Sequence, residues 1–445
     1  MNLKRICASL LLGAIAMLSA FPAEAGSGRF GMEATPAYWL SRTPHAQEII
    51  LTPEQISAQN QDLQLRDTSL VDLTACPDFM PGREVRQHIM AAMQDFWQET
   101  LPEEYVAGEL LTWDRWQMVR SNCSLSNLPE EAEAEYAVTV QRANLRLLPV
   151  AEAWNDEPDE HFDDLQGTVL DPAEAVIIWH RSLDGKFAFV QAADYQGWVR
   201  TDYLALAERE DWLRYASPAQ VAVVTINRKT LEAGGTTQLY QLGASIPLGK
   251  VRGQTGELEA GTWGLLLPTR DAEGRLYIDN APAHFDETLH QGFLPCTRGN
   301  FITMAFKCLG DPYGWGGQDN SVDCSSFVQD VYHTMGVKIP RDADHQELAL
   351  LKQVKLGGLD TDSRYKLLRR QAEPGDLLFK PGHVMMYLGK DDSGTPLCIH
   401  STSGYFINEA AGQYVRGVLV SDLTYHNSAG EETIDGLTSI AGIWH

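Results

Sequence analysis

The sequence predicts a multidomain chain with a mainly helical and irregular N-terminal segment, two small β-barrels and a C-terminal α+β domain. Two changes of hydrophobic period along the 445 residues support this division. Near residue 137 helical spacing gives way to short alternating runs broken by Gly, Asp and Pro, as in small barrels. From about residue 291 helix and strand patterns are mixed. The expected domains are 26–128, 129–210, 211–290 and 291–445.

The first 25 residues have the pattern of a secretory signal peptide. Lys4 and Arg5 supply the positive charge before the apolar run ICASLLLGAIAML. The small-x-small tripeptide AEA at 23–25 is the expected cleavage site. The apolar run is too short to favour a membrane span, and no later stretch is long enough for one. We therefore expect residues 1–25 to be removed and the mature protein to be exported, either to the periplasm or out of the cell.

The composition is that of a globular protein with a strong excess of acidic residues. Hydrophobic residues make up 44% of the chain, and the formal net charge is −25 at pH 7. A surface this acidic repels nucleic acid and anionic lipid, so nucleic acid is set aside as a partner. Six cysteines follow the signal peptide, and an exported protein can hold them in disulfides. Cys76 and Cys123 are a plausible pair because both fall in the N-terminal segment, and the full disulfide pattern stays open.

Two helices are expected in the N-terminal segment. The run LTPEQI has helix-start chemistry, with Thr52 as the cap, Pro53 at the first helical position and Gln55 completing a capping box. A second helix is expected from the four-residue spacing of Val85, Ile89, Met93 and Trp97. Further on, the first barrel contains a long acidic loop, AEAWNDEPDEHFDD, which is expected either to reach a cleft or to be solvated surface.

Cys324, in the run DCSSFV, is the candidate nucleophile. The helical spacing after it places Cys324 at a helix start, where unpaired N–H groups and the helix dipole favour a thiolate. Three glycines within 314–317 allow the preceding backbone to approach a ligand closely. A thiolate nucleophile needs a base, and a third group must orient that base. Two downstream histidines in strand patterns, His383 and His400, are able to fill these two roles.

Simpler roles also fit these residues when each is taken alone. A single cysteine in a helix is usually a small core residue, and a single strand histidine is usually a satisfied hydrogen-bonding residue. A zinc site of one cysteine and two histidines is a further alternative, although the spacing is not that of a finger or a zinc-dependent hydrolase. Cys398 shares a strand face with His400, but no helix start surrounds it.

The order of the motifs favours the catalytic roles of these residues over the simpler ones. LGDPYGWGG, DCSSFV, IPRDADHQ, EPGDLLFK, GHVMMYLG and IHSTS together resemble the NlpC-type cell-wall cysteine peptidases. The resemblance covers about 291–445 and implies a papain-like fold that needs no metal or cofactor. It implies that Cys324 is the nucleophile, His383 the general base and His400 the residue that orients the base. Tyr313 matches an active-site tyrosine that helps the N–H of Cys324 to stabilise the oxyanion.

The two barrels, with RANLRLLP and YQGWVRTDYL, resemble bacterial SH3-like domains. The whole layout resembles the γ-D-glutamyl-L-diamino-acid endopeptidases, in which the first barrel abuts the site and a free N-terminal L-Ala is accepted. By this resemblance Asp323, Glu174 and Tyr195 bind that amine, since carboxylates and a tyrosine suit a buried ammonium. Ser325 joins the substrate-binding set. Alternatively, Asp323 is only a helix cap and Glu174 and Tyr195 are ordinary barrel surface.

The sequence therefore predicts an exported cysteine peptidase that hydrolyses the γ-D-glutamyl–diamino acid bond of peptidoglycan stem peptides. Its expected partners are these stem peptides with a free N-terminal L-Ala, and neither nucleic acid nor a membrane span is expected. One alternative is a non-catalytic module that binds the cell wall. Another is an amidase or acyltransferase on the same fold. The choice between diaminopimelate and lysine as the third stem residue stays open.

Overall fold

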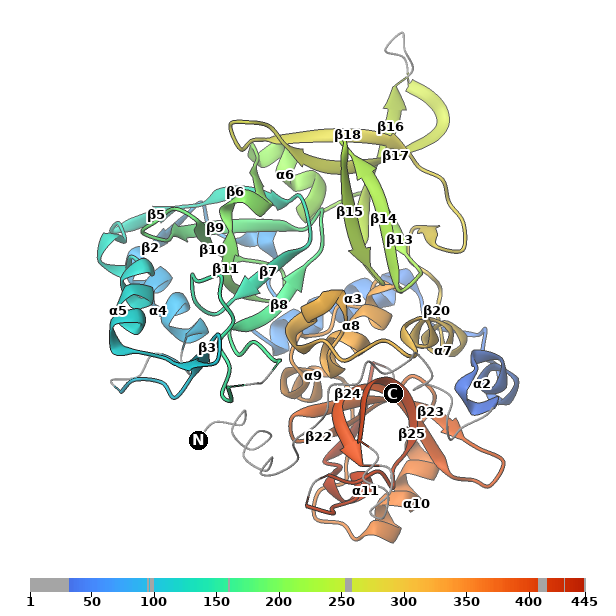
Figure 1. Ribbon diagram of the computed structural model, residues 1–445. Coiled ribbons are helices and arrows are strands. Elements are labelled where there is room, and N and C mark those ends of the chain that lie inside the picture. The colour runs from blue at the N-terminus through green and yellow to red at the C-terminus, as the bar shows by residue number, and fades with distance from the viewer. Residues whose placement is uncertain are drawn as a thin grey trace. The chain divides into compact units, whose positions relative to one another are not determined.

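The computed structural model describes residues 32–93, 96, 100–158, 161–252, 258–406, 414–427 and 429–443 (Figure 1). The expected signal peptide and Trp97 lie outside these residues. The described chain forms two compact units. The first comprises the described parts of Met1–Thr68, Leu294–Trp315 and Asp319–His445, and the second those of Ser69–Phe293 and Gly316–Gln318. The predicted N-terminal segment is therefore shared between the two units.

A six-stranded sheet is the centre of the first unit. Its order is β21-β26-β22-β23-β24-β25, and each neighbouring pair is antiparallel. The strands, drawn in orange and red in Figure 1, are β21 (Lys352–Lys355), β22 (Leu377–Lys380), β23 (His383–Lys390), β24 (Pro396–Phe406), β25 (Tyr414–Asp422) and β26 (Ser439–Gly442). The first six residues of β23 are all buried, so this strand reads as a continuous apolar run because both of its faces are covered.

Helices cover this sheet, and the mixed helix and strand content that the sequence predicts is confirmed. α8 packs against β23 and β24 and also against α7, where the rings of Phe301 and Tyr332 lie 4.7 Å apart. The helices of the first unit are α2 (Pro36–Arg42), α3 (Pro53–Arg66), α7 (Arg298–Ala305), α8 (Cys324–His333), α9 (Ala343–Ala349), α10 (Thr361–Gln371) and α11 (Thr433–Gly436). Short 3-10 turns add η1 (Met32–Ala34), η5 (Phe306–Cys308) and η6 (Trp315–Asn320), the last of which crosses between the units.

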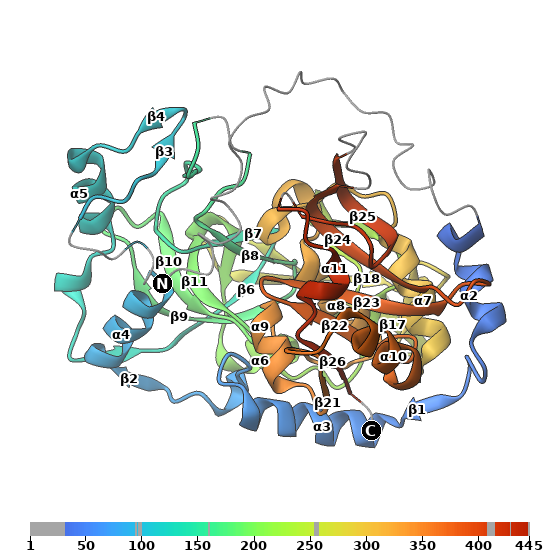
Figure 2. The ribbon, with the colours of Figure 1, turned by 90° about the horizontal axis from the view of Figure 1, so that it is seen from below.

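Residues 32–68 are bound to the C-terminal domain within the first unit. α3 begins with the predicted capping box of Thr52 and Gln55. In the middle of α3, the amide of Asn60 donates to the carbonyl of Gly336 at 2.9 Å and accepts from the N–H of Lys338 at 2.9 Å. β1 (Ile49–Leu51) pairs with β20 (Cys296–Thr297), and β1 and α3 both lie at the lower edge of the view in Figure 2. This early segment is thus a structural part of the C-terminal domain.

The first barrel of the second unit is a seven-stranded sheet of order β12-β6-β9-β10-β11-β7-β8. Its core contains Trp198, Phe189 and Val190, which are at most 1% exposed. The strands are β6 (Glu135–Thr139), β7 (Ala143–Arg146), β8 (Gln166–Leu170), β9 (Ala175–Arg181), β10 (Phe187–Gln191), β11 (Gln196–Arg200) and β12 (Leu204–Leu206), with the turn η4 (Thr201–Tyr203).

The second barrel follows α6 (Arg209–Ala216) and has a five-stranded sheet of order β18-β17-β16-β13-β19 with a separate hairpin, β14–β15. Its strands are β13 (Val221–Val224), β14 (Arg228–Ala233), β15 (Thr236–Gln241), β16 (Ser245–Arg252), β17 (Leu258–Arg270), β18 (Leu276–Pro282) and β19 (Leu289–Gln291). Two small barrels in tandem, as the alternating patterns predict, are therefore present.

The rest of the second unit is helical and irregular, with small strand pairs. It contains η2 (Leu73–Ala75), β2 (Phe79–Pro81), α4 (Gly82–Ala92), β3 (Tyr105–Val106), β4 (Glu109–Leu110), α5 (Trp113–Asn122), η3 (Leu125–Asn127) and β5 (Glu131–Glu133). The predicted four-residue spacing is that of α4, in which Val85 and Ile89 are fully buried, as is Met93 at its C-cap. Among the described residues, no helix is long and apolar enough to cross a bilayer.

The expected disulfide between Cys76 and Cys123 is wrong. All six described cysteines have free thiols. Cys123 points into the core under α4, where its sulfur lies 3.6 Å from that of Met93 and donates to the carbonyl of Val119. Cys76 is only partly buried and its thiol faces the carbonyl of Asp72. The two thiols thus have separate surroundings, which their shared domain in the sequence did not reveal.

The acidic loop of the first barrel is folded into the second unit. Trp154 is fully buried, with its ring 5.8 Å from that of Trp116. Asp163 forms a buried ion pair with Arg146 at 2.5 Å and accepts from the N–H of Trp154. The loop is therefore not simply solvated surface, because a tryptophan anchor and a buried ion pair hold both of its ends.

Candidate active site

The cysteine predicted to be the nucleophile is the first residue of α8. Asp323 is the N-cap: its Oδ1 accepts from the N–H of Ser326 at 2.8 Å, while Ser326 Oγ accepts from the N–H of Asp323 at 3.0 Å. This capping box ends the extended backbone at Asp323 and starts the helix at Cys324. The predicted helix start is confirmed. Asp323 is the N-cap of this helix, which is the alternative role that the sequence predicts for it.

Cys324 is 7% exposed, and α8, which it begins, packs against β23. Burial, with a smaller contribution from the Asp323 carboxylate, raises the pKa of its thiol to about 12. The N–H groups of Val384 and Ser325 and the charge of Arg341 oppose these two effects without overcoming them. Desolvation thus opposes the thiolate that the helix start is expected to favour.

The two predicted histidines lie in a row across neighbouring strands. His383 begins β23, and the register of Met386 with Ile399 sets it diagonally across from His400 on β24. His383 Nε2 lies 2.8 Å from His400 Nδ1, and the rings meet edge to face at 73°. On the far side, His400 Nε2 lies 2.9 Å from Ser421 Oγ on β25. The sequence prediction paired the histidines but did not include Ser421.

Both imidazoles are neutral in the resting protein. Burial lowers the pKa of His383 well below its ordinary value, and repulsion from His400 and Lys380 lowers it further. Burial, with a smaller effect of Lys380, lowers the pKa of His400 to about 3. The resting site thus consists of a neutral thiol and two neutral rings, so a proton must move from sulfur to a ring during any nucleophilic step.

Alkylation by iodoacetamide is expected to be slow at Cys324 at pH 7 and to rise about tenfold per pH unit up to pH 10, since only the thiolate reacts. The pKa of about 12 leaves no plateau in this range. Mass spectrometry of the peptide that contains Cys324 measures the rate, with the partly exposed Cys76 as an internal control. A plateau that begins at acidic pH would show a preformed thiolate and contradict the neutral resting site.

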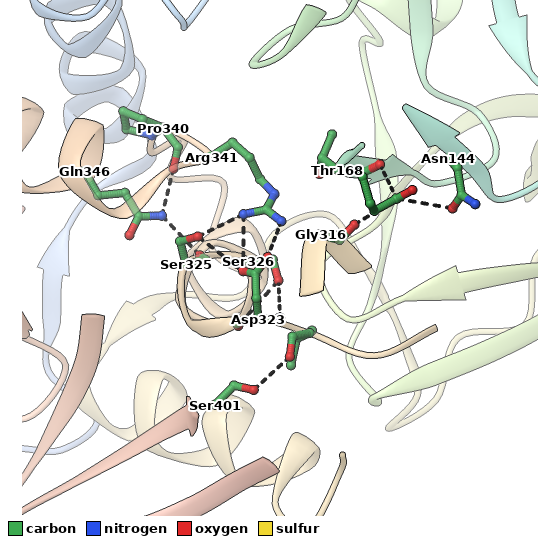
Figure 3. A network of polar contacts seen from close by, with 12 residues as sticks. Asn144, Thr168, Gly316, Asp323, Ser325, Ser326, Pro340, Arg341, Gln346 and Ser401 are labelled. Carbon is green, nitrogen blue, oxygen red and sulfur yellow. Dashed lines mark hydrogen bonds and ion pairs between the residues drawn. The ribbon is translucent and has the colours of Figure 1, made fainter. Parts of the chain in front are cut away.

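A buried ion pair supports the start of α8 (Figure 3). Arg341 donates to Asp323 Oδ2 at 2.6 Å and to Oδ1 at 3.2 Å, and it also donates to Ser325 Oγ at 2.9 Å. Burial alone would raise the pKa of Asp323, but the charge and hydrogen bonds of Arg341 outweigh it and hold this pKa below its ordinary value. Gln346 completes the network by donating to the carbonyls of Ser325 and Pro340.

Arg341 and Gln346 belong to the quoted motif IPRDADHQ, yet the sequence reasoning gave neither of them a role. No local signal pointed to this pairing, because Arg341 lies 18 positions from Asp323, in a polar run with Asp342 and Asp344. Ser325, predicted to bind substrate, is 6% exposed and donates to Asp323 at 3.2 Å. In this structure its hydroxyl is part of the support of the helix start.

Tyr313 lies next to the segment that leads into α8. It forms an isolated parallel bridge with Val322, two residues before the cysteine, and is 7% exposed. The carbonyl of Val322 also accepts from Ser401 Oγ at 2.7 Å, which joins this strand-like segment to β24 next to His400. The first unit thus contains Tyr313 together with Asp323, Ser325 and the Cys-His-His set.

The two remaining predicted residues belong to the second unit. Glu174 Oε1 accepts from the N–H of Asp171 at 2.6 Å, so its carboxyl closes a turn of the barrel. Desolvation raises the pKa of Glu174 well above its ordinary value, and the charges of Asp171 and Asp194 add to this. Tyr195 packs its ring against Gly167, where a Cβ would lie 2.6 Å from the ring.

Two of the glycines expected to let backbone approach a ligand, Gly316 and Gly317, are needed for close packing within the second unit. A Cβ on Gly316, whose φ is +54°, would lie 2.7 Å from Gln166, and a Cβ on Gly317 would meet Val169. Gln166 donates to the carbonyl of Gly316 at 3.1 Å. Gln318 accepts from the N–H of Asp163 at 3.0 Å. These glycines are therefore needed where residues 316–318 pack on strand β8 and the acidic loop.

Among the residues that the structure describes, no group of three or more His, Cys, Asp or Glu side chains is arranged to hold a metal ion. The two histidines bond to each other at 2.8 Å.

Comparison with known proteins assigns the part of the chain that holds this geometry. Residues 310–423 match the NlpC/P60 family. The chain carries an NlpC/P60 domain. This match includes the cysteine, both histidines and Ser421, and it confirms the family that the motifs resemble. Residues 152–200, inside the first barrel, match the SH3 domain of the SH3b1 type.

The chain is also similar to individual known proteins. Over 108 residues the chain is 32% identical to dipeptidyl-peptidase 6 of Lysinibacillus sphaericus, which is 24% of this chain and 33% of that protein. The match therefore spans about one third of the length of this curated relative. A solved NlpC/P60 endopeptidase from Photobacterium damselae subsp. piscicida has a TM-score of 0.69 and 17% identity, covering 88% of this chain and 94% of that chain. An NlpC/P60 family protein from Bacillus cereus has a TM-score of 0.41 at 18% identity, over 63% and 83% of the two chains.

The first of these structures shows that the fold of the NlpC/P60 domain and its accompanying domains recurs at low sequence identity. The predicted fold class, with SH3-like β domains and a papain-like C-terminal domain, is confirmed.

Proposed function

We propose that this chain is an exported cysteine endopeptidase that hydrolyses the γ-D-glutamyl–diamino acid bond of peptidoglycan stem peptides with a free N-terminal L-Ala. The observation that carries the proposal is the pair of histidines on the two strands against which α8 packs. Cys324 begins α8, and on those strands His383 bonds to His400 at 2.8 Å. A nucleophile, a base and a group that orients the base are what acyl transfer by a cysteine requires.

In the proposed reaction, the Cys324 thiol gives its proton to His383 Nδ1 as the sulfur attacks the γ-carbonyl carbon of D-Glu. The N–H of Cys324 and the hydroxyl of Tyr313 stabilise the oxyanion of the tetrahedral intermediate. The imidazolium of His383 then protonates the leaving amine of the diamino acid, and L-Ala-γ-D-Glu stays on the sulfur as a thioester. Water attacks this thioester, His383 accepts its proton, and the thiol is restored.

His383 uses Nδ1 in this scheme because His400 is bonded to its Nε2. The same bond stabilises the imidazolium, since its Nε2–H then donates to a fixed acceptor. The neutral resting state suits this general-base sequence, because His383 must be unprotonated to accept the thiol proton.

Three features support a free N-terminal dipeptide as the recognised portion. The curated relative is named a dipeptidyl-peptidase, and L-Ala-γ-D-Glu is a dipeptide with a free amine. Asp323 stays ionised because Arg341 holds its pKa low, so it suits an ammonium partner. Burial raises the pKa of Glu174, and a cation bound beside this carboxyl would lower it again. Asp323, with Ser325 bonded to it, is the proposed amine-binding carboxylate of the first unit, and Glu174 and Tyr195 are the proposed amine-binding residues of the second.

L-Ala-γ-D-Glu-meso-diaminopimelate is expected to be cleaved to the dipeptide and the free diamino acid, while the same peptide N-acetylated at L-Ala is cleaved at least about 100-fold more slowly. The reason is that acetylation removes the charge that the carboxylates would pair with. Mass spectrometry of both products gives the two rates. The L-Lys tripeptide, measured alongside, decides the third stem residue.

Equal cleavage of both peptides would keep the peptidase activity and remove the amine-binding proposal. Cleavage of neither would contradict the proposed function, and product analysis on intact cell wall would then separate an amidase or acyltransferase from a binding module. An acyltransferase would need an added amine or thiol acceptor for product to form, whereas a binding module would retain wall and release nothing.

A further inference from the structure

We propose that Ser421 is a positioning residue for the reaction: its hydroxyl oxygen accepts from His400 Nε2–H and so holds both histidines in the tautomer that lets His383 act as a base. The proposal rests on the proposed function only for the role of His383. The contacts themselves belong to the sheet of the first unit.

The three side chains form one row across β23, β24 and β25. His400 pairs with Leu419 and Cys398 pairs with Ser421, so Ser421 is diagonal to His400 on the same face. The row is linked by His383 Nε2 to His400 Nδ1 at 2.8 Å and by His400 Nε2 to Ser421 Oγ at 2.9 Å. His400 is 1% exposed and Ser421 2% exposed, so water does not replace either bond.

The direction of these hydrogen bonds follows from the state in which His383 carries a proton on both nitrogens. Its Nε2–H must then donate to His400 Nδ1, which has to be an acceptor. His400 is neutral, with a pKa lowered to about 3, so its single proton must be on Nε2. That N–H points at Ser421 Oγ, which is therefore the terminal acceptor of the row.

Cys398 completes the arrangement from the other side of the hydroxyl. Its sulfur lies 3.4 Å from Ser421 Oγ, and burial raises its pKa to about 12, so it stays a thiol. When Ser421 Oγ accepts from His400, the hydroxyl hydrogen is free to turn toward this sulfur, a weak acceptor. The buried cysteine that shares a strand face with His400 thus supports the hydroxyl and takes no part as a nucleophile.

Alanine at 421 removes the hydroxyl that accepts from His400 Nε2–H when His383 is protonated. Since losing a buried hydrogen bond is costly, kcat for the stem peptide is expected to fall about 10- to 100-fold with KM unchanged. In the resting protein His400 then places its proton on Nδ1 and donates to His383. His383 in turn carries its proton on Nδ1, which is the wrong nitrogen for a base facing the thiol.

The test compares wild type, Ser421→Ala and Ser421→Thr, each labelled with ¹⁵N-histidine, by two-bond ¹H–¹⁵N correlation NMR. His383→Gln and His400→Gln assign the two rings. We expect Nε2–H tautomers in wild type and Ser421→Thr, and Nδ1–H tautomers in Ser421→Ala. Ser439→Ala is the matched control, since it removes a buried hydroxyl of the same sheet that bonds to Glu347 and should leave tautomers and kcat unchanged.

Unchanged tautomers in a folded Ser421→Ala protein would overturn the proposal, even with a lower kcat, because that result marks a purely structural serine. If Ser421→Ala does not fold, Ser421→Cys replaces it, since sulfur is a weak acceptor of similar size, and tautomers equal to those of Ser421→Thr would again overturn the proposal. The NMR result does not depend on substrate. A tautomer change in a protein that leaves the stem peptide uncut would support Ser421 and contradict the proposed function alone.

Discussion

Alanine in place of Cys324 is expected to lower kcat for the stem peptide by about 10,000-fold or more, to the level that binding and oxyanion stabilisation give without a nucleophile. The thiol sulfur is the atom that forms the thioester in the proposed reaction, and Cys324 directly follows the N-cap of α8, the helix that packs against the strands of both histidines. Mass spectrometry of the released diamino acid over long incubations measures the remaining rate.

The control is Cys76→Ala, which removes a partly exposed thiol of the second unit and should retain the wild-type rate. The double variant Cys324→Ala/His383→Ala is expected to lose no more than the single variant, because a nucleophile and its base act as one unit. Calorimetric binding of the uncleaved stem peptide to Cys324→Ala should persist. Full cleavage by Cys324→Ala would sink the cysteine mechanism, whatever the other variants do.

The parts of the site that sequence predicts are those set by local patterns. The helix start at Cys324 follows from an N-cap aspartate and an apolar run with helical spacing, and both are short-range features. The strands that hold His383 and His400 read as apolar runs bounded by turn residues. Their roles came from the order of six motifs, and the family match supports that order.

The parts that sequence does not predict depend on contacts between distant residues. Ser421 meets His400 only through the register of β24 with β25, and a single serine in an apolar strand carries no signal of this. The resting protonation of Cys324 depends on burial, which the helix start alone does not reveal. Gly316 and Gly317 look like ligand-binding glycines, yet side chains of β8 account for them. The separate surroundings of Cys76 and Cys123 likewise follow from packing.

Methionine in place of Arg341 is expected to destabilise the first unit by about 3–5 kcal/mol, because it leaves the buried Asp323 carboxylate without its charge partner. The ion pair is 2.6 Å long, and its side chains are 3% and 9% exposed. Urea unfolding, followed by hydrogen exchange of peptides from α8, reports the first unit separately from the barrels. Arg66→Met is the matched control, since its pair with Asp62 is 47% and 44% exposed and should be worth less than about 1 kcal/mol.

The double variant Asp323→Asn/Arg341→Met separates the charge from the cap. Asparagine keeps an N-cap oxygen for Ser326 but carries no charge, so we expect most of the lost stability to return. The pH dependence gives the same information. The folded pKa of Asp323 is lowered, so its stabilisation is present above the unfolded pKa and is lost as pH falls through the folded pKa. That acid limb should be absent in Asp323→Asn/Arg341→Met. If Arg341→Met is as stable as wild type, the buried carboxylate of Asp323 does not need Arg341 as its charge partner, and this prediction is wrong.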